Sequence, residues 1–102
     1  MIDIIIPAYN AHNTIKKTLI SICMQTVKDK INVYIIDDCS NEDYKEIINI
    51  FKDKINIKYY KLKENSGPGV ARQYGIEHSN GEYIYFLDAD DMFMDIYSLE
   101  NL

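Results

Sequence analysis

The sequence predicts an α/β fold in which a mostly parallel, doubly wound sheet is built in the order β-α-β-α-β-α-β. Three short apolar runs are each stopped by proline or by polar residues, which is typical of buried strands, and a fourth, more amphipathic stretch also favours a strand. The first two of the three longer stretches between them repeat their apolar residues every three or four positions, which indicates amphipathic helices, and the third opens with Pro68 after a Gly/Pro-rich loop. Regular alternation of strand and helix favours parallel strands joined by right-handed crossovers.

The first strand and the first helix are predicted from residues 3 to 23. An isoleucine run at residues 4–6 is stopped by Pro7, so we expect a buried strand over residues 3–7. From Asn13, which has the side chain of an N-cap, the apolar period becomes that of a helix. The apolar face of this helix consists of Ile15, Leu19, Ile22 and Cys23.

The second strand and the second helix follow in the same way. An apolar run at residues 33–36 ends at Asp37 and Asp38, which predicts a buried strand with a polar carboxyl end. Ser40 and Asp43 have the spacing of a capping box, so we expect them to open the second helix. The apolar face of that helix consists of Tyr44, Ile47, Ile48 and Phe51.

The last elements complete the alternation. Residues 57–62 form a more amphipathic third strand, which we expect near an edge of the sheet. Pro68 is suited to the first position of a helix that runs to about residue 79 and is ended by Asn80-Gly81. Residues 83–87 predict a fourth strand that runs directly into Asp88, and the stretch after Phe93 is expected to begin another helix.

Length and composition indicate one globular domain over residues 1–102. The chain is 47% hydrophobic and 26% charged, and its formal net charge is −5. Its 11 Lys and Arg residues are scattered among 16 acidic residues without a basic stripe, so nucleic acid is not an expected partner. An acidic protein that binds a phosphorylated ligand needs a local cation to do so.

The cysteines and the amino-terminal residues bear on the compartment. Cys23 and Cys39 have neither the spacing of a disulfide framework nor that of a zinc site, which favours a reducing, cytoplasmic environment. The first residues lack the regions of a signal peptide, and no apolar run approaches the roughly 20 residues that span a bilayer. We therefore expect no membrane span in this chain, although a longer parent protein could hold it at the inner face of a membrane.

The strongest chemical signal is Asp88-Ala89-Asp90, at the end of an apolar strand. Side chains two positions apart on a strand point to the same side, so both carboxylates can face one ligand while Ala89 turns inward. Carboxylate oxygens suit Mg²⁺ or Mn²⁺, and such a cation would neutralise a diphosphate. The alternative is a solvated turn in which the aspartates bind nothing.

Three further residues lie where ligands bind in such sheets, beyond the carboxyl ends of the strands. Asp38 could accept a hydrogen bond from a base N–H or a ribose hydroxyl, or it could simply form a turn or an N-cap. Tyr9 could stack on a nucleobase or only cover the end of the sheet. Arg72, one turn into the third helix, could reach a phosphate or a base carbonyl, or be a surface arginine.

Five stretches, in this order, resemble the amino-terminal portion of family 2 glycosyltransferases with the GT-A fold. They cover nearly all of the chain and read IIIPAYNAHNTI, SICMQT, VYIIDDCSNE, ENSGPGVARQYGI and NGEYIYFLDADD. The resemblance implies the Rossmann-like nucleotide-binding half of a GT-A domain, which binds a UDP-, GDP- or dTDP-sugar with a divalent metal (Mn²⁺ or Mg²⁺). It also implies inverting transfer to a hydroxyl of a polysaccharide, glycan or lipid-linked acceptor, as in the synthesis of cell-surface polysaccharides.

The resemblance also implies roles for single residues. A nucleotide pocket is implied in which Pro7, Ala8 and Tyr9 line the base site, Asp38 contacts the base and Arg72 holds the nucleotide. Asp88 would lie near the ribose and the waters of the metal, and Asp90 would ligate the metal, so that Asp88 and Asp90 form the metal site. Asp37 and Asp91 are candidates of second rank. Gln73 departs from the asparagine that the family very often has there.

No catalytic residue is expected within the chain. Members of the family extend well past the DxD motif, so we expect a domain truncated before the acceptor-binding portion, with the general base beyond residue 102. One alternative is a nucleotide-sugar-binding module without turnover, because the base is missing. Another, suggested by FLDADD, is a haloacid-dehalogenase-like phosphatase, but in that family the motif opens the chain and is followed by groups that have no room here.

Overall fold

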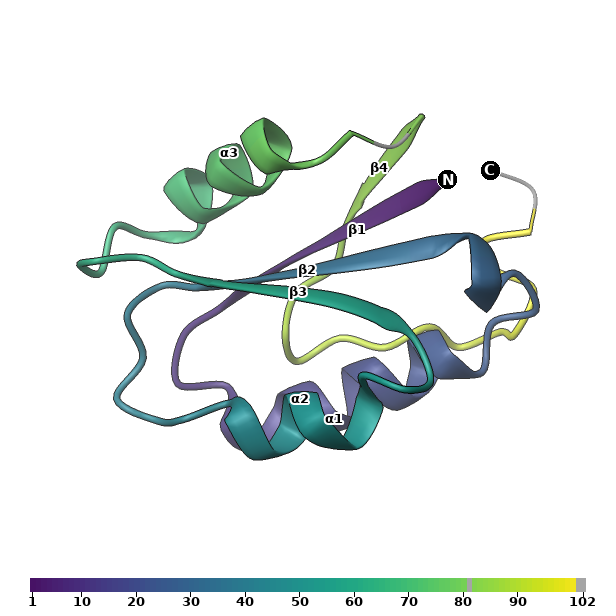
Figure 1. Cartoon of the computed structure of the whole chain (residues 1–102), viewed down its shortest axis with the longest axis horizontal. Helices are drawn as coiled ribbons and strands as arrows, with labels where there is room; N and C mark the ends of the chain where they lie inside the picture. Colours follow the sequence, from purple (N-terminus) through teal and green to yellow (C-terminus); the bar gives the residue numbers. More distant parts are fainter. Residues whose placement is uncertain (81, 101–102) are drawn as a thin grey trace.

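The chain forms one parallel four-stranded sheet with helices on both faces, in a computed structural model that describes residues 1–80 and 82–100 (Figure 1). The strands are β1 (Ile2–Ala8), β2 (Ile31–Asp37), β3 (Asn56–Lys61) and β4 (Tyr83–Phe86), in the spatial order β3-β2-β1-β4. The helices are α1 (His12–Cys23), α2 (Lys45–Phe51) and α3 (Pro68–His78), with a short 3₁₀ turn, η1, at Lys28–Lys30. The predicted α/β fold, its element order and the edge position of β3 are confirmed.

The core is divided into two layers by the alternation of side chains along the central strands. On β1, Ile4 and Ile6 pack on the side of α1 and α2, whereas Ile5 between them packs against α3. All three side chains are fully buried. Both faces of the strand are therefore covered, which explains why it is a continuous apolar run rather than an alternating one.

Helix α3 approaches the sheet closely because one of its two buried residues is a glycine. Gly75 lies over β1, and a Cβ atom added to it would be only 2.5 Å from Cγ2 of Ile5. The other buried residue of the helix is Ala71, which is also small. This contact determines how close α3, and Arg72 on it, lies to the sheet.

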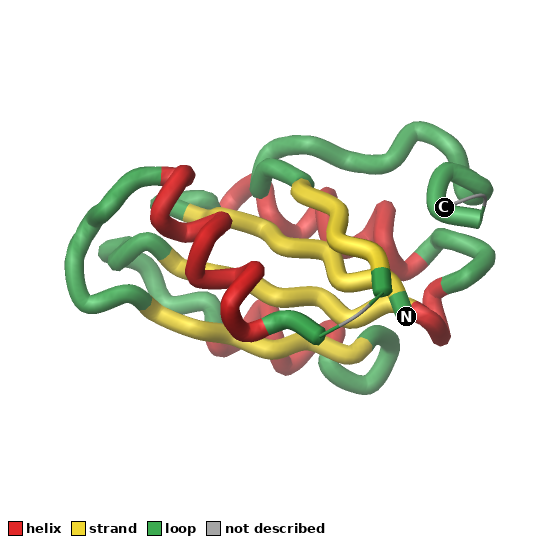
Figure 2. Tube along the Cα trace, turned by 90° about the horizontal axis from the view of Figure 1, so that it is seen from above, coloured by secondary structure: helices red, strands yellow, loops and turns green. Residues whose placement is uncertain are grey.

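The direction of chain winding reverses beside β1. β1 pairs with β2 on one side and with β4 on the other, and all pairings are parallel. The crossovers through α1 and α2 pass over one face of the sheet, and the crossover through α3 passes over the opposite face, as Figure 2 shows from above. A crevice is expected outside the carboxyl ends of the strands at such a switch point, here between β1 and β4.

Two predicted helix caps are wrong. α1 begins at His12 with Ala11 as its N-cap, so Asn13 lies inside the helix. α2 begins only at Lys45, so Ser40 and Asp43 do not form a capping box. In both places the cause is tertiary, because the side chain of Tyr44 binds Ser40 and the amide of Ala11 instead.

The chain after β4 is irregular. The expected helix after Phe93 is wrong for residues 94–100, which form bends and turns held by short-range bonds such as Ser98 N to Asp95 O, 3.1 Å. α3 ends at His78, one residue before the predicted end, and Asn80 already lies outside the helix. Gly81, the second residue of the predicted stop, lies outside the described residues. In residues 1–80 and 82–100, the longest helix is too short and too polar to cross a bilayer.

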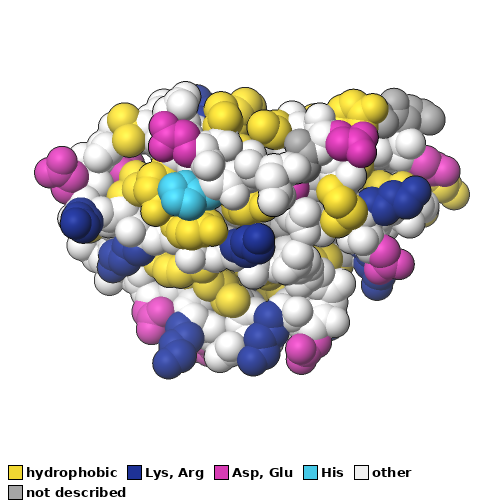
Figure 3. Space-filling model, turned by 45° about the horizontal axis from the view of Figure 1, so that its top comes forward, with side chains coloured by type: hydrophobic (Ala, Val, Ile, Leu, Met, Phe, Trp, Pro, Cys, Tyr) yellow, Lys and Arg dark blue, Asp and Glu magenta, His cyan; other side chains and the backbone are white. Residues whose placement is uncertain are grey.

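Strand β4 exposes apolar and aromatic side chains. All four side chains of β4 are exposed, by 37% to 50%. Among the described residues, β1 is the one strand that pairs with β4, so β4 forms an edge. On the face turned forward in Figure 3, hydrophobic side chains lie between charged side chains of both signs, which are interspersed rather than gathered by sign.

Candidate functional site

A cavity of about 320 Å³ opens at the carboxyl ends of β1 and β4, at the switch point of the sheet. Its walls come from the loop that joins β1 to α1, from the first turn of α1 and from the segment that follows β4. The lining residues are Pro7, Tyr9, Asn10, Ala11, Thr14, Asp88, Ala89 and Asp90. Two of the predicted stretches, 7–9 and 88–90, are thus brought together although 79 positions separate Tyr9 from Asp88 in the chain.

Two of the lining residues, Asp88 and Asp90, form a cluster of carboxylates with Asp91. One oxygen each of Asp88, Asp90 and Asp91 lies within 4.8 Å of the others, and all three residues are exposed. Ala89 between them is buried at 7% exposure, so the predicted division of this tripeptide into outward carboxylates and an inward methyl is confirmed. Three oxygen donors with solvent access fit a hard divalent cation, which keeps several water ligands.

Arg72 of α3 reaches the same cluster. Its Nη2 atom lies 3.4 Å from Oδ1 of Asp88, and both side chains are substantially exposed, by 40% and 57%. Arg72 is the only arginine in the chain. Its guanidinium therefore places positive charge at the edge of an otherwise negative cluster, within reach of an anion that would bridge the two.

The residues that end β1 differ in what they expose. The Tyr9 side chain is 49% exposed and borders the cavity, so it is not simply packed over the end of the sheet. Pro7 is half-buried and also borders the cavity. Ala8 is 2% exposed, its methyl lies in the core under the sheet, and its carbonyl accepts the amide of Asp38 at 2.8 Å. Ala8 thus holds the end of β2 rather than lining the cavity itself.

Asp38 is held by the loop that leads into α3. Its Oδ1 accepts the amide of Ser66 at 2.7 Å, and its Oδ2 accepts the amide of Gly67 at 2.8 Å. Gly67 has φ = 91°, a conformation that side chains rarely adopt, so glycine is required there. Asp38 is 4% exposed and does not border the cavity. Each of its oxygens keeps a second lone pair for a ligand donor.

Asp37 is fully buried and supports the loop rather than facing a ligand. One oxygen accepts the amide of Ser40 at 2.8 Å, and the other accepts the hydroxyl of Tyr59 in a short hydrogen bond. Burial raises the pKa of the Tyr59 phenol above its ordinary value, and the bond to Asp37 raises it further. The phenol is therefore a firmly protonated donor for this carboxylate.

Hydrogen bonds between the loops after β1 and β2 fix the floor of the site. The Ser40 hydroxyl accepts the amide of Asn10 at 2.8 Å and lies 3.0 Å from the hydroxyl of Tyr44. Tyr44 in turn accepts the amide of Ala11 at 2.9 Å, and Asn10 Oδ1 accepts the amide of Asn41 at 2.9 Å. Asn10 has φ = 49°, a region in which asparagine is enriched.

Asn10 and Thr14, which line the cavity, and Tyr44, which supports its loops, are not predicted from the sequence. An Asn directly after a strand is a weak signal for a left-handed turn, and it could have identified Asn10. Nothing local indicates Tyr44, because its partners lie 4 and 33 positions away. His12 starts α1, and His78 bonds the carbonyl of Tyr74 from the last turn of α3, in keeping with surface or cap positions.

The chain matches the family model described as glycosyl transferase family 2 over residues 3–102. It is 44% identical over 92 residues to an uncharacterised glycosyltransferase of Rickettsia conorii, covering 90% of this chain and 15% of that protein. It is 34% identical over 91 residues to the poly(ribitol-phosphate) β-N-acetylglucosaminyltransferase TarS of Staphylococcus aureus, covering 87% and 16%. The chain thus spans about one sixth of the length of these curated relatives.

The fold agrees with a solved structure of the second relative. The crystal structure of S. aureus TarS 1-349 in complex with UDP superimposes with a TM-score of 0.91 at 31% sequence identity. The match covers 98% of this chain and 30% of that chain. Nearly every described element therefore has a counterpart in a structure that holds a nucleotide.

Proposed function

Because the chain belongs to glycosyltransferase family 2 and has the GT-A fold, we propose that its cavity binds the nucleoside diphosphate of a sugar nucleotide for glycosyl transfer. The observation that carries the proposal is the meeting of Tyr9 with the carboxylate cluster at the switch point of the sheet. An exposed ring beside a site for a cation suits a ligand with a flat base at one end and a diphosphate at the other.

In this proposal each predicted residue keeps a defined role. Pro7 and Tyr9 border the base site, and Ala8 supports it from below through its bond to Asp38. Asp38 accepts a hydrogen bond from the base, because the amides of Ser66 and Gly67 leave a lone pair free on each of its oxygens. Arg72 binds the nucleotide through its guanidinium, which hydrogen-bonds phosphate in a fixed, two-pronged geometry.

A divalent cation, Mn²⁺ or Mg²⁺, is proposed at the carboxylate cluster. Asp90 would ligate it, Asp88 would hold it directly or through water beside the ribose, and Asp91 adds a third oxygen. When bound, such a cation supplies positive charge that stabilises a departing diphosphate. The fit rests on the donor set. Three exposed carboxylates this close together repel one another, and a bound cation would remove that repulsion.

The proposed reaction is a single displacement with inversion at the anomeric carbon. An acceptor hydroxyl oxygen forms the new bond to that carbon as the bond to the nucleoside diphosphate oxygen breaks, and the hydroxyl proton passes to a general base. We propose that this base is not one of the aspartates of this edge. Asp37 and Asp38 are held by hydrogen bonds, and the Asp88 to Asp91 cluster faces the leaving group.

The donor is proposed to be a UDP-sugar rather than a GDP- or dTDP-sugar, because TarS, 31% identical to this chain, has a solved structure with UDP. The acceptor is proposed to be a hydroxyl of a glycan or lipid-linked chain of a cell-surface polysaccharide. Both described cysteines are unpaired, which supports work in the reducing cytoplasm. Membership of family 2 leaves no support for the phosphatase alternative.

Calorimetric titration of the chain with UDP, with and without Mn²⁺, tests the proposal. We expect binding that falls sharply on addition of EDTA and that is lost in Asp90→Ala. Glu82→Gln is the matched control, because it also removes one exposed carboxylate but lies at the opposite end of β4. UDP binding that is unchanged by EDTA and by Asp90→Ala would refute the metal site.

An assay of sugar transfer by the same chain distinguishes a transferase from a module that only binds the donor. With UDP-sugar, Mn²⁺ and a glycan acceptor, we expect the 102-residue chain to bind the donor but to form little or no product. A positioned base contributes on the order of 10²–10⁴-fold in rate, and this edge has none to spare. Acceptor-dependent product that disappears in Asp90→Ala would show that the base is one of these residues.

A further inference from the structure

Helix α1 and the turn that follows it carry three buried polar side chains on the side that meets the segment after β4. Thr18, Ser21 and Gln25 are spaced by three and four positions, so they lie on one side of the helix and its end. Their exposures are 0%, 8% and 3%. Buried polar groups of this kind need hydrogen-bond partners, and none of these three is charged.

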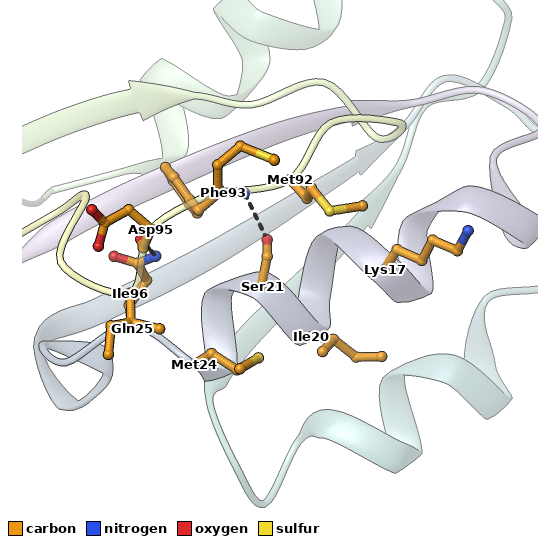
Figure 4. Close-up of a pocket in the computed structure, with 10 residues that line it drawn as sticks. Lys17, Ile20, Ser21, Met24, Gln25, Met92, Phe93, Asp95 and Ile96 are labelled. Atoms are coloured by element: carbon orange, nitrogen blue, oxygen red, sulfur yellow. Dashed lines mark hydrogen bonds between the residues drawn. The ribbon is translucent and has the colours of Figure 1, made fainter.

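Each of the three finds its partner in the backbone after β4. The Thr18 hydroxyl lies 3.1 Å from the carbonyl oxygen of Ala89 and 2.5 Å from that of Asp91. Ser21 Oγ accepts the amide of Phe93 at 3.0 Å, the bond drawn in Figure 4. Gln25 donates to the carbonyl of Asp95 at 2.7 Å and accepts the amide of Leu99 at 3.1 Å.

These side-chain contacts stand where the hydrogen bonds between β1 and β4 have ended. The amide of Leu87 still bonds the carbonyl of Ile5 on β1, at 3.1 Å, but the strand pairing has already ended at Phe86. From Ala89 onward, side chains of α1 and of Gln25 just after it bond the backbone groups that a strand or helix would otherwise satisfy. The conformation of the segment is thus set by side chains that precede it by about 70 positions.

Thr18 is distinguished from the other two by where it acts. Ser21 and Gln25 border a separate apolar cavity of about 250 Å³, together with Ile20, Met24 and residues 92–96 (Figure 4). Thr18 instead lies within hydrogen-bond distance of the carbonyl oxygens of Ala89 and Asp91, inside the turn whose residues Asp88, Asp90 and Asp91 carry the carboxylates. A backbone bond from the amide of Asp91 to the carbonyl of Asp88, 3.0 Å, closes the turn.

We propose that Thr18 is a positioning residue for the metal site, because its hydroxyl holds the Asp88 to Asp91 turn with the carbonyls inward and the carboxylates outward. The hydroxyl has one proton for these two carbonyl oxygens. Without it neither carbonyl keeps this side-chain donor, and the turn that carries the carboxylates is no longer held against α1. This inference rests on the proposed function. Thr18 does not border the cavity, so its proposed effect is on the geometry of the aspartates.

The test compares Thr18→Val, which keeps the shape but removes the hydroxyl, with Thr18→Ser, which keeps the hydroxyl. Free Mn²⁺ is measured by electron paramagnetic resonance during titration of each variant of the full chain with UDP present. We expect about three- to tenfold weaker Mn²⁺ binding in Thr18→Val, because a buried hydrogen bond is lost, and binding within about twofold of wild type in Thr18→Ser. Hydrogen exchange of the Asp91 amide should accelerate in Thr18→Val even without metal.

Ile22→Val is the stability control, since it removes one methyl group from a buried side chain of the same helix. It should lower the melting temperature without changing Mn²⁺ affinity or Asp91 exchange. Equal Mn²⁺ affinity in wild type and Thr18→Val would overturn the inference, as would equal weakening in Thr18→Ser. If wild type itself binds no Mn²⁺, the proposed function fails and the inference with it, whereas a loss confined to Thr18→Val leaves the proposed function intact.

Discussion

Arg72 and Asp88 form an ion pair, with Nη2 and Oδ1 3.4 Å apart, that joins helix α3 to the chain just after β4. The pair lies at the point where a nucleotide phosphate and a metal ion are both proposed to bind. Asp88 therefore has two possible positive partners, and Arg72 has two possible negative ones. Because both side chains are exposed, the pair itself contributes little to stability.

Arg72→Gln is expected to change metal and nucleotide affinity in opposite directions. Removing the guanidinium leaves three carboxylates without their nearest cation, so Mn²⁺ alone should bind about two- to fivefold more tightly at low salt. UDP should bind more weakly in the same variant. Arg72→Lys keeps the charge but loses the planar fork, so it should leave Mn²⁺ affinity near wild type and still weaken UDP. Mn²⁺ and UDP titrations of both variants make the comparison, and weaker Mn²⁺ binding in Arg72→Gln would contradict it.

Asp38→Asn is expected to lower both stability and nucleotide affinity. An amide side chain has one oxygen, so it cannot accept the amides of both Ser66 and Gly67 as the carboxylate does. The free energy of unfolding in urea should fall by about 1.5–3 kcal/mol, and UDP binding should weaken by about 1–3 kcal/mol. Asp43→Asn is the control, because Asp43 is exposed and, within the described part of the chain, its side chain accepts the amide of Lys45 alone. Reduced stability with unchanged UDP affinity would mean that Asp38 only clamps the loop.

Two glycine substitutions in α3 should have opposite signs. Gly75→Ala places a methyl group 2.5 Å from Cγ2 of Ile5, so the helix must move away from β1, at a cost of about 1–3 kcal/mol. At Gly69 an added Cβ has no atom within 4 Å, so Gly69→Ala should be neutral or stabilise the helix by up to about 1 kcal/mol. Thermal unfolding measures both. If the two variants unfold at the same temperature, the close packing of α3 on β1 is not limiting.

The raised pKa of Tyr59 predicts how the stability of the fold changes with pH above neutrality. Burial, followed by the bond to Asp37, raises its pKa above the ordinary value of 10.0, so the folded state favours the neutral phenol. This contribution is fully present below pH 10 and is lost as the pH rises through the folded pKa. Tyr59→Phe should therefore lower stability at neutral pH and flatten its decline above pH 10. Urea unfolding from pH 7 to 11 measures the effect, with the exposed Tyr97→Phe expected to follow the wild-type curve.

The parts of the fold that the sequence predicted correctly depend on local periodicity. The run at residues 4–6 is apolar at each position because both faces of β1 are covered, and no helix could be so short. Asp88 and Asp90 are exposed and Ala89 is buried, as predicted, but the predicted reason is wrong: β4 ends at Phe86, and a turn closed by the bond from Asp91 N to Asp88 O brings the carboxylates together. Their roles toward metal and nucleotide remain predictions.

The parts that could not be predicted depend on contacts between distant residues. Ser40 looked like a cap because its nearest neighbours fit one, but the hydroxyl of Tyr44 and the amide of Asn10 bind it instead. Asp38 has its partners 28 and 29 positions later. Thr18 sits on a helix as a small polar residue with no signal of its own, since the carbonyls it holds come 71 and 73 positions later.

The exposed strand β4 limits how this chain can be handled in solution. Its outer edge, among residues 1–80 and 82–100, offers unpaired backbone groups beside aromatic and aliphatic side chains, which is the surface that templates pairing with another extended segment. A preparation of the chain should therefore lose monomer as its concentration rises, through edge-to-edge contacts unrelated to nucleotide. Light scattering at increasing protein concentration would locate the limit, and an affinity measured above it would describe clusters rather than the single domain.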